Sequence, residues 1–237
     1  MPLPQLNAVP KYEMVMPSTG KPHKFRPFLV KEEKVLMIAA ESQEPSQIVY
    51  AIGQIVEDCV DGLVKEDLSS VDVEYAFLKI RSKSVGETAS INLKCQHCET
   101  ENIPYEIKLD EIKPPELAST KGTKKIDLGN NIFINLQVPR YVSMAGLDIN
   151  PENPTDAVFA LVTTCIESII TENEHIKAAD VTQKELSDFL ESMTNNQFKE
   201  IQDFVQELPK LQHEVKYNCP KCEKPNTLTL EGVQSFF

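Results

Sequence analysis

Several features typical of enzymes and of nucleic-acid-binding proteins are missing from this sequence. It has no tryptophan, only eight glycines, and a formal net charge of −12. A negative net charge argues against a general affinity for the phosphate backbone of nucleic acids. The sequence also lacks a glycine-rich nucleotide loop, and its four histidines form neither a His-Glu-x-x-His pattern nor a Ser/His/Asp motif. We therefore predict a structural or interaction protein rather than an enzyme.

Long apolar runs are also missing. No stretch is long and apolar enough to cross a bilayer, and residues 1–6 lack the basic and apolar segments of a secretory signal. Four of the six cysteines have the spacing of metal ligands, whereas Cys59 and Cys165 each stand alone in an apolar helical pattern. This usage is typical of a reducing compartment and not of a disulfide framework. We therefore expect the protein to fold in a cytoplasm, without a membrane, and both lone cysteines to be core residues.

One short pattern occurs twice, at residues 91–102 and 215–226. Each copy has alternating apolar and polar residues, then Cys, two spacers, Cys and Glu, with an Asn three residues after the Glu. Each copy predicts a strand that enters a tight Cys-x-x-Cys turn and is followed by a return strand, at residues 105–109 and 227–230. Such turns direct both sulfurs and nearby backbone N–H groups towards one ion.

The two pairs together supply four thiolates, a ligand set that suits a tetrahedral structural zinc ion. We predict that one Zn²⁺ is bound by Cys95, Cys98, Cys219 and Cys222, with His97 as a spacer. The 120 residues between Cys98 and Cys219 are tolerable, because the entropic cost of closing a loop grows only slowly with its length. Two unrelated turns or a redox dithiol are the alternatives, and no βαβ pattern supports the redox interpretation.

The remaining patterns predict an α+β fold with a split, zinc-ribbon-like β unit. Residues 1–86 are expected to form an N-terminal hairpin and helices, residues 87–112 the first zinc knuckle, and residues 212–237 the second. Residues 113–211 are expected to be an inserted region with a β-hairpin at 124–138, a loop at 139–154 and three helices. The first of these helices carries an apolar face that includes Val158, Cys165, Ile166 and Ile169, and the other two begin at capping boxes after Thr182 and Thr194.

The segment from Lys24 to Leu36 reads KFRPFLVKEEKVL. Together with residues 6–13 and 55–59 it resembles the baseplate hub and hub-assembly proteins of T4-like contractile-tailed phages. The resemblance extends through the first cysteine pair and, more loosely, to the chain end. It implies a late structural or assembly protein whose partners are other baseplate hub proteins, with self-association into a homo-oligomer left open. It implies location in the host cytoplasm during assembly or in the tail baseplate of the virion, and it transfers no catalytic residue.

A different function class remains open on the sequence alone. Zinc ribbons are common in nucleic-acid-binding proteins, so the alternative is an accessory factor that binds nucleic acid through its ribbon. That protein would be retained on a DNA column with a steep salt dependence. The acidic charge and the absence of a basic patch with interleaved aromatics around either cysteine pair favour the baseplate hypothesis.

Overall fold

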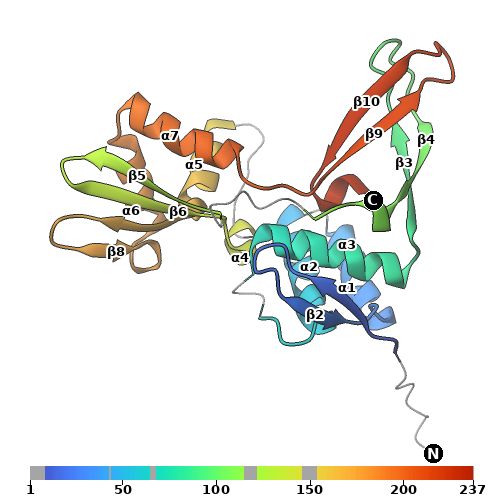
Figure 1. The fold of residues 1–237 in the computed structure, drawn as a ribbon, viewed down its shortest axis with the longest axis horizontal. Coiled ribbons are helices and arrows are strands. Elements are labelled where there is room, and N and C mark those ends of the chain that lie inside the picture. The colour runs from blue at the N-terminus through green and yellow to red at the C-terminus, as the bar shows by residue number, and fades with distance from the viewer. Residues whose placement is uncertain (1–8, 43, 65–67, 115–121, 146–153, 237) are drawn as a thin grey trace, which may run out of the picture.

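The computed structural model describes residues 9–42, 44–64, 68–114, 122–145 and 154–236. Figure 1 shows three parts: an N-terminal body of helices with a small hairpin, an arm of two long hairpins that projects from it, and a separate α/β part on the other side. The C-terminus lies where the arm meets the body. Among the described residues, no helix has the length and apolar character needed to span a membrane.

The N-terminal part contains the hairpin and the three helices that the sequence predicts. Strands β1 (Tyr12–Val15) and β2 (Pro22–Phe25) pair antiparallel, and their side chains Met14 and Phe25 are buried in the core. The helices are α1 (Val30–Glu41), α2 (Pro45–Cys59) and α3 (Ser70–Ser84). Proline at the first turn of α2 and a Ser69 side chain that accepts from the Asp72 N–H at the start of α3 explain where these helices begin.

The arm consists of two antiparallel hairpins from distant parts of the chain. Strands β3 (Thr88–Leu93) and β4 (Ile103–Lys108) form the first, and β9 (Gln212–Asn218) and β10 (Pro225–Glu231) form the second. Their inner side chains share one core with Tyr75 and Leu78 of α3, and the 3₁₀ helix η4 (Val233–Phe236) closes its base with the fully buried Phe236. The arm therefore rests on α3 at one end only.

The inserted part is built on a four-stranded antiparallel sheet in the order β5-β6-β7-β8. Its strands are β5 (Thr123–Gly129), β6 (Ile132–Gln137), β7 (Ile166–Ile170) and β8 (His175–Lys177). Its helices are α4 (Tyr141–Ala145), α5 (Pro154–Cys165), α6 (Gln183–Glu191) and α7 (Asn195–Gln206). Side chains of the sheet and of α5, α6 and α7 form a core of their own.

The predicted turn and capping boxes of this part are confirmed. Gly129, Asn130 and Asn131 all have positive φ, of 82°, 52° and 58°, which is the backbone conformation that a tight hairpin turn requires and that Gly and Asn tolerate best. The Thr182 and Thr194 side chains accept from the N–H groups of Glu185 and Gln197, whose side chains accept from the threonine N–H groups in return.

Two predictions for the inserted part were wrong. The helix expected to continue through Ile169 ends at Cys165, and Ile166 and Ile169 lie in β7, a strand that the sequence did not reveal, beside the equally unexpected β8. Pairing with β6 decides this segment, because an apolar run of β-branched residues fits a strand as well as a helix. The predicted hairpin is thus half of a sheet. The predicted loop at 139–154 contains helix α4, and residues 146–153 lie outside the described residues.

Candidate metal centre

The two cysteine pairs form turns with the same backbone geometry. In the first, the N–H of Cys95 donates to the Thr100 carbonyl at 2.8 Å, and the N–H of Glu99 donates to the Cys95 carbonyl at 3.1 Å. In the second, Cys219 donates to Lys224 at 3.1 Å, and Glu223 donates to Cys219 at 2.9 Å. The residue after the second cysteine has a positive φ in both turns, 55° at Glu99 and 57° at Glu223. The repeat in the sequence is therefore a repeat in structure.

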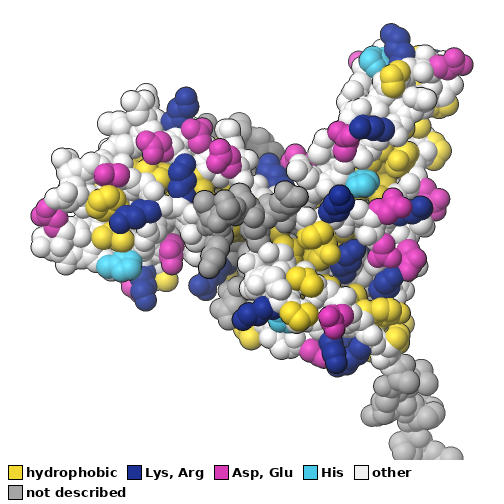
Figure 2. Space-filling model, in the orientation of Figure 1, with side chains coloured by type: hydrophobic (Ala, Val, Ile, Leu, Met, Phe, Trp, Pro, Cys, Tyr) yellow, Lys and Arg dark blue, Asp and Glu magenta, His cyan; other side chains and the backbone are white. Residues whose placement is uncertain are grey.

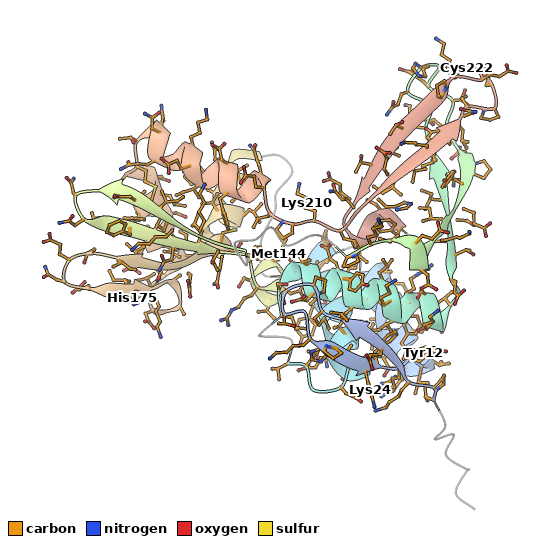
Figure 3. All side chains as sticks on the ribbon, viewed as in Figure 1. Tyr12, Lys24, Met144, His175, Lys210 and Cys222 are labelled. Carbon is orange, nitrogen blue, oxygen red and sulfur yellow. The ribbon has the colours of Figure 1, made fainter. Side chains whose placement is uncertain are left out.

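The four cysteines meet at the outer end of the arm, where Figure 3 labels Cys222. Their sulfur atoms all lie within 4.8 Å of one another. The Sγ atoms of Cys95 and Cys222 are 3.7 Å apart, and those of Cys98 and Cys219 are 3.6 Å apart. A tetrahedral zinc ion with Zn–S distances of about 2.3 Å implies sulfur–sulfur distances of about 3.8 Å. These two distances match edges of such a tetrahedron.

Backbone and side-chain donors surround these sulfurs. The N–H groups of His97 and Lys221, each two residues after a cysteine, lie 3.4 Å from the sulfurs of Cys95 and Cys219. The hydroxyl of Thr100 lies 3.2 Å from the sulfur of Cys98. Hydrogen bonds from the Thr100 side chain and backbone lower the pKa of Cys98 to about 6, which favours its thiolate.

The pKa values of Cys95 and Cys222 are each shifted by opposing causes. Burial raises the pKa of Cys95, but hydrogen bonds from the N–H groups of His97 and Cys98 outweigh it and lower the pKa overall. The N–H of Lys224 lowers the pKa of Cys222, whereas desolvation and the neighbouring sulfurs raise it to about 11. Four sulfurs this close cannot all ionise easily without a compensating positive charge, and a bound cation supplies one.

An asparagine of the repeated pattern, to which the sequence assigned no role, joins the two turns. Asn226 is almost fully buried, and its side-chain oxygen accepts from the Gln96 N–H at 2.9 Å while its amide donates to the Lys224 carbonyl at 3.0 Å. The Gln96 amide in turn donates to the Thr227 carbonyl at 3.1 Å. The asparagine common to both copies of the repeat was the available signal, but its counterpart Asn102 is exposed and has a different role, with a positive φ of 57°.

The side chains of the other candidate residues lie outside the sulfur cluster. The His97 ring contacts the Pro225 carbonyl at 3.1 Å, on the neighbouring turn. Cys59 and Cys165 are buried in the cores of the N-terminal and inserted parts, as predicted, and burial raises their pKa values to about 11 and about 12. Within the described part of the chain, no other group of three or more His, Cys, Asp and Glu side chains is close enough to hold a metal ion.

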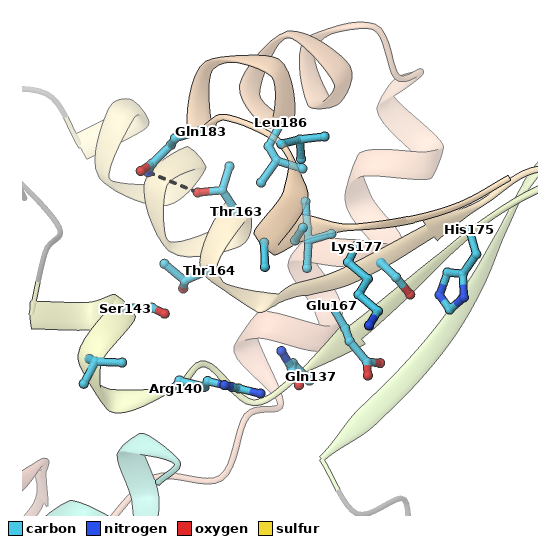
Figure 4. Close-up of a pocket in the computed structure, with 16 residues that line it drawn as sticks. Gln137, Arg140, Ser143, Thr163, Thr164, Glu167, His175, Lys177, Gln183 and Leu186 are labelled. Carbon is cyan, nitrogen blue, oxygen red and sulfur yellow. Dashed lines mark hydrogen bonds between the residues drawn. The ribbon is translucent and has the colours of Figure 1, made fainter. Parts of the chain in front are cut away.

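An open groove of about 820 Å³ lies in the inserted part, beside β7 and β8 (Figure 4). Arg140, Glu167, His175 and Lys177 line it, and Gln183 donates to the Thr163 hydroxyl at 3.4 Å on its wall. These side chains come from different elements. Among the described residues of the groove, no hydrogen bond joins a nucleophile to a base.

Comparison with known proteins gives the family. A family model described as T4 bacteriophage base plate protein matches residues 9–237. The chain is 28% identical over 216 residues to the baseplate hub assembly protein gp26 of Enterobacteria phage T4, and the match covers 90% of each chain. No solved structure matches the chain. The resemblance seen in the sequence is confirmed: the chain belongs to the family of T4 bacteriophage base plate proteins.

Proposed function

We propose that this chain is a structural or assembly protein of the baseplate hub of a contractile-tailed phage, which binds other hub proteins. The observation that carries this proposal is the similarity to a hub assembly protein along nine-tenths of both chains. The proposed role is non-catalytic, and it places the protein in the host cytoplasm during assembly and in contact with the tail baseplate. We further propose that the regions 1–86, 87–112, 113–211 and 212–237 are its structural units.

The second part of the proposal is a structural Zn²⁺ bound by Cys95, Cys98, Cys219 and Cys222. It is supported by sulfur–sulfur distances of 3.6 and 3.7 Å, by the N–H donors to the sulfurs, and by the soft, four-thiolate ligand set. Four protein ligands fill a tetrahedral ion and leave no position for an activated water. The ion would hold the two hairpins of the arm together and so present a rigid surface to partners.

The charges of the arm favour a protein partner over nucleic acid. Figure 2 shows basic and acidic side chains interspersed along it instead of a basic patch. Lys94, Lys108 and Lys216 lie 3.1, 3.1 and 2.6 Å from the carboxylates of Glu101, Glu111 and Glu214. A lysine beside a carboxylate is a poor phosphate ligand, because the acid repels the incoming anion.

Affinity purification from infected cells tests the role. The full chain with a tag should co-purify with other baseplate hub proteins, and the tag alone should not. The double variant Cys95→Ser/Cys219→Ser tests whether an intact arm is needed for binding. We expect it to capture less of the hub proteins than the wild-type chain does. If the wild-type chain captures no baseplate protein, the proposed function is wrong. Mass spectrometry of purified virions then distinguishes a component of the mature particle from a protein that acts only during assembly.

The alternative, a nucleic-acid-binding zinc-ribbon factor, has its own test. Retention of the metal-loaded chain on a DNA column, with an affinity that falls steeply as salt rises, would support it. Passage of the chain through the column at low salt would exclude it. The interspersed charges of the arm lead us to expect the second result.

A further inference from the structure

Helix α1 exposes most of its apolar side chains to solvent. Seven of its twelve residues are apolar, yet Ala39 is the only one of them that is buried. Val30, Met37 and Ile38 are 80%, 60% and 57% exposed. A surface helix normally turns its apolar side chains towards the core, so an outward apolar face indicates an interaction surface.

The orientation of α1 is set by a polar contact on its inner side. Glu32 is buried, and its carboxylate lies 2.8 Å from the Arg26 guanidinium and accepts from the Leu29 N–H at 2.8 Å. Arg26 also donates to the Asp58 carbonyl of α2, at 3.1 Å. Turning the helix to bury Met37 and Ile38 would pull Glu32 away from these partners. The apolar residues therefore stay outside while this ion pair exists.

Two opposite charges flank the apolar centre of the outer face. Lys34 lies one turn before Ile38, and Glu41 lies one turn after Met37. Both charged side chains are exposed, and among the described residues neither has an ion-pair partner. The face thus carries a basic end, an apolar centre and an acidic end.

We propose that a second copy of this chain covers this face, with the two α1 helices antiparallel across a two-fold axis. A two-fold axis at the Met37–Ile38 pair brings Met37 of one copy against Ile38 of the other. The same register places Lys34 opposite Glu41 of the second copy, and the symmetry repeats this contact. A face that is complementary to itself in charge and register fits a two-fold dimer better than an unrelated partner.

The interface is small, because one helix from each copy supplies most of it. Specific interfaces below about 1,200 Å² of total buried surface are typical of weak and transient complexes. We therefore expect a reversible dimer whose population rises with concentration. The proposed dimer does not depend on the baseplate role, because it forms between two copies of this chain.

Sedimentation equilibrium of the full chain over a range of concentrations tests the dimer. Lys34→Glu and Glu41→Lys each place like charges opposite one another at both symmetry-related contacts, and each should weaken dimerisation by about tenfold or more. An equimolar mixture of the two variants should restore it, because both contacts between one copy of each variant then pair an acidic side chain with a basic one. Lys199→Glu, an equal charge change at an exposed residue of α7, is the matched control and should leave the dimer unchanged.

Three outcomes would overturn the proposal. One is a wild-type chain that stays monomeric at all concentrations. Another is a dimer that tolerates both charge reversals, and the third is a mixture of the two variants that stays monomeric. Circular dichroism of each variant checks its fold, and both substituted side chains are exposed, so loss of the dimer would not reflect unfolding.

Discussion

The arm and the inserted part are both antiparallel β structures, but they are stabilised in different ways. The inserted sheet has four strands, and helices α5, α6 and α7 pack against it to form a separate core. The arm has two separate two-stranded hairpins, and its base rests on α3. An isolated two-stranded hairpin is marginally stable in water, whereas three or more strands with a covered apolar face are stable. The part with the smaller sheets is also the part with the cysteine cluster.

This difference indicates how the two ends of the arm are held. Near its base, Leu109, Leu211 and Phe236 are buried together with Leu78 of α3. At its outer end, the hairpins meet through the four sulfurs and the hydrogen bond from the Gln96 N–H to the Asn226 side chain. An apolar core stabilises the first end, and the proposed metal would stabilise the second.

The largest effect is expected from removing a sulfur. Cys95→Ser and Cys219→Ser should each lose the ion and destabilise the arm by several kcal/mol, because the free energy of binding a structural zinc ion adds to that of folding. Elemental analysis gives the metal content, and hydrogen exchange should show loss of protection in the arm and not in the inserted part. Cys165→Ala, outside the cluster, is the control and should keep the ion. If one of the two serine variants retained full zinc, the shared site would be wrong.

A core truncation in the inserted part should lower the stability of the protein without removing the ion. Ile134→Ala removes a fully buried side chain from the sheet, and such truncations cost about 2–5 kcal/mol. The measurement is denaturant unfolding together with metal content. We expect a clear loss of stability with the ion retained. Loss of the ion in this variant would show that the two parts are not stabilised separately.

A smaller effect is expected at the contact between the two turns. Asn226→Ala truncates a nearly fully buried side chain that makes two hydrogen bonds, to the Gln96 N–H and the Lys224 carbonyl, and each such bond contributes about 0.5–1.5 kcal/mol. Urea unfolding of the metal-loaded chain measures it. Asn92→Ala, on the exposed side of β3, is the matched control and should change the free energy of unfolding by less than about 0.5 kcal/mol. Equal effects of the two substitutions would contradict this role of Asn226.

The smallest effect concerns Glu74, which connects α3 to η4 at the base of the arm. Burial raises the pKa of Glu74 to about 7, although the Val233 N–H donates to it and lowers the pKa in part. The folded protein therefore holds a proton that the unfolded chain releases near pH 4.5. The contribution of this proton to the free energy of unfolding is lost as the pH rises through about 7.

Glu74→Gln should remove this pH dependence and raise the melting temperature at pH 8 by about 2–4 °C, which corresponds to about 1 kcal/mol for a chain of this size. Thermal unfolding at pH 5 and pH 8 measures it. The two proteins should differ less at pH 5, where Glu74 is protonated in the folded state. An equal difference at both pH values would show that the substitution acts through packing and not through ionisation.

Local signals predicted much of the fold. The capping boxes at Thr182 and Thr194 give their own hydrogen-bond partners within three residues, and the turn at Gly129–Asn131 depends only on residues that tolerate positive φ. The repeated Cys-x-x-Cys pattern likewise indicated which four sulfurs come together. The capping boxes and the turn are decided by contacts within a few residues, and the cysteines were recognised from the spacing within each pair and from its repetition.

The strand at Ile166–Ile170 shows where such signals stop. Its apolar, β-branched residues fit both a helix and a strand, and the choice depends on β6, which lies about thirty residues earlier. The role of Asn226 also depends on a distant segment, because its partner Gln96 is 130 residues away. Neither could be derived from the pattern around the residue itself.

The sequence by itself determined the capped starts of α6 and α7, the hairpin turn at Gly129–Asn131 and the four cysteines of the cluster, because short-range hydrogen bonds and spacing decide these. Only the tertiary structure decided that the inserted hairpin is part of a larger sheet, that Asn226 joins the two turns, and that the apolar face of α1 points outwards. The physical reason is that strand pairing, burial and the orientation of a helix depend on contacts between segments that are far apart in the chain.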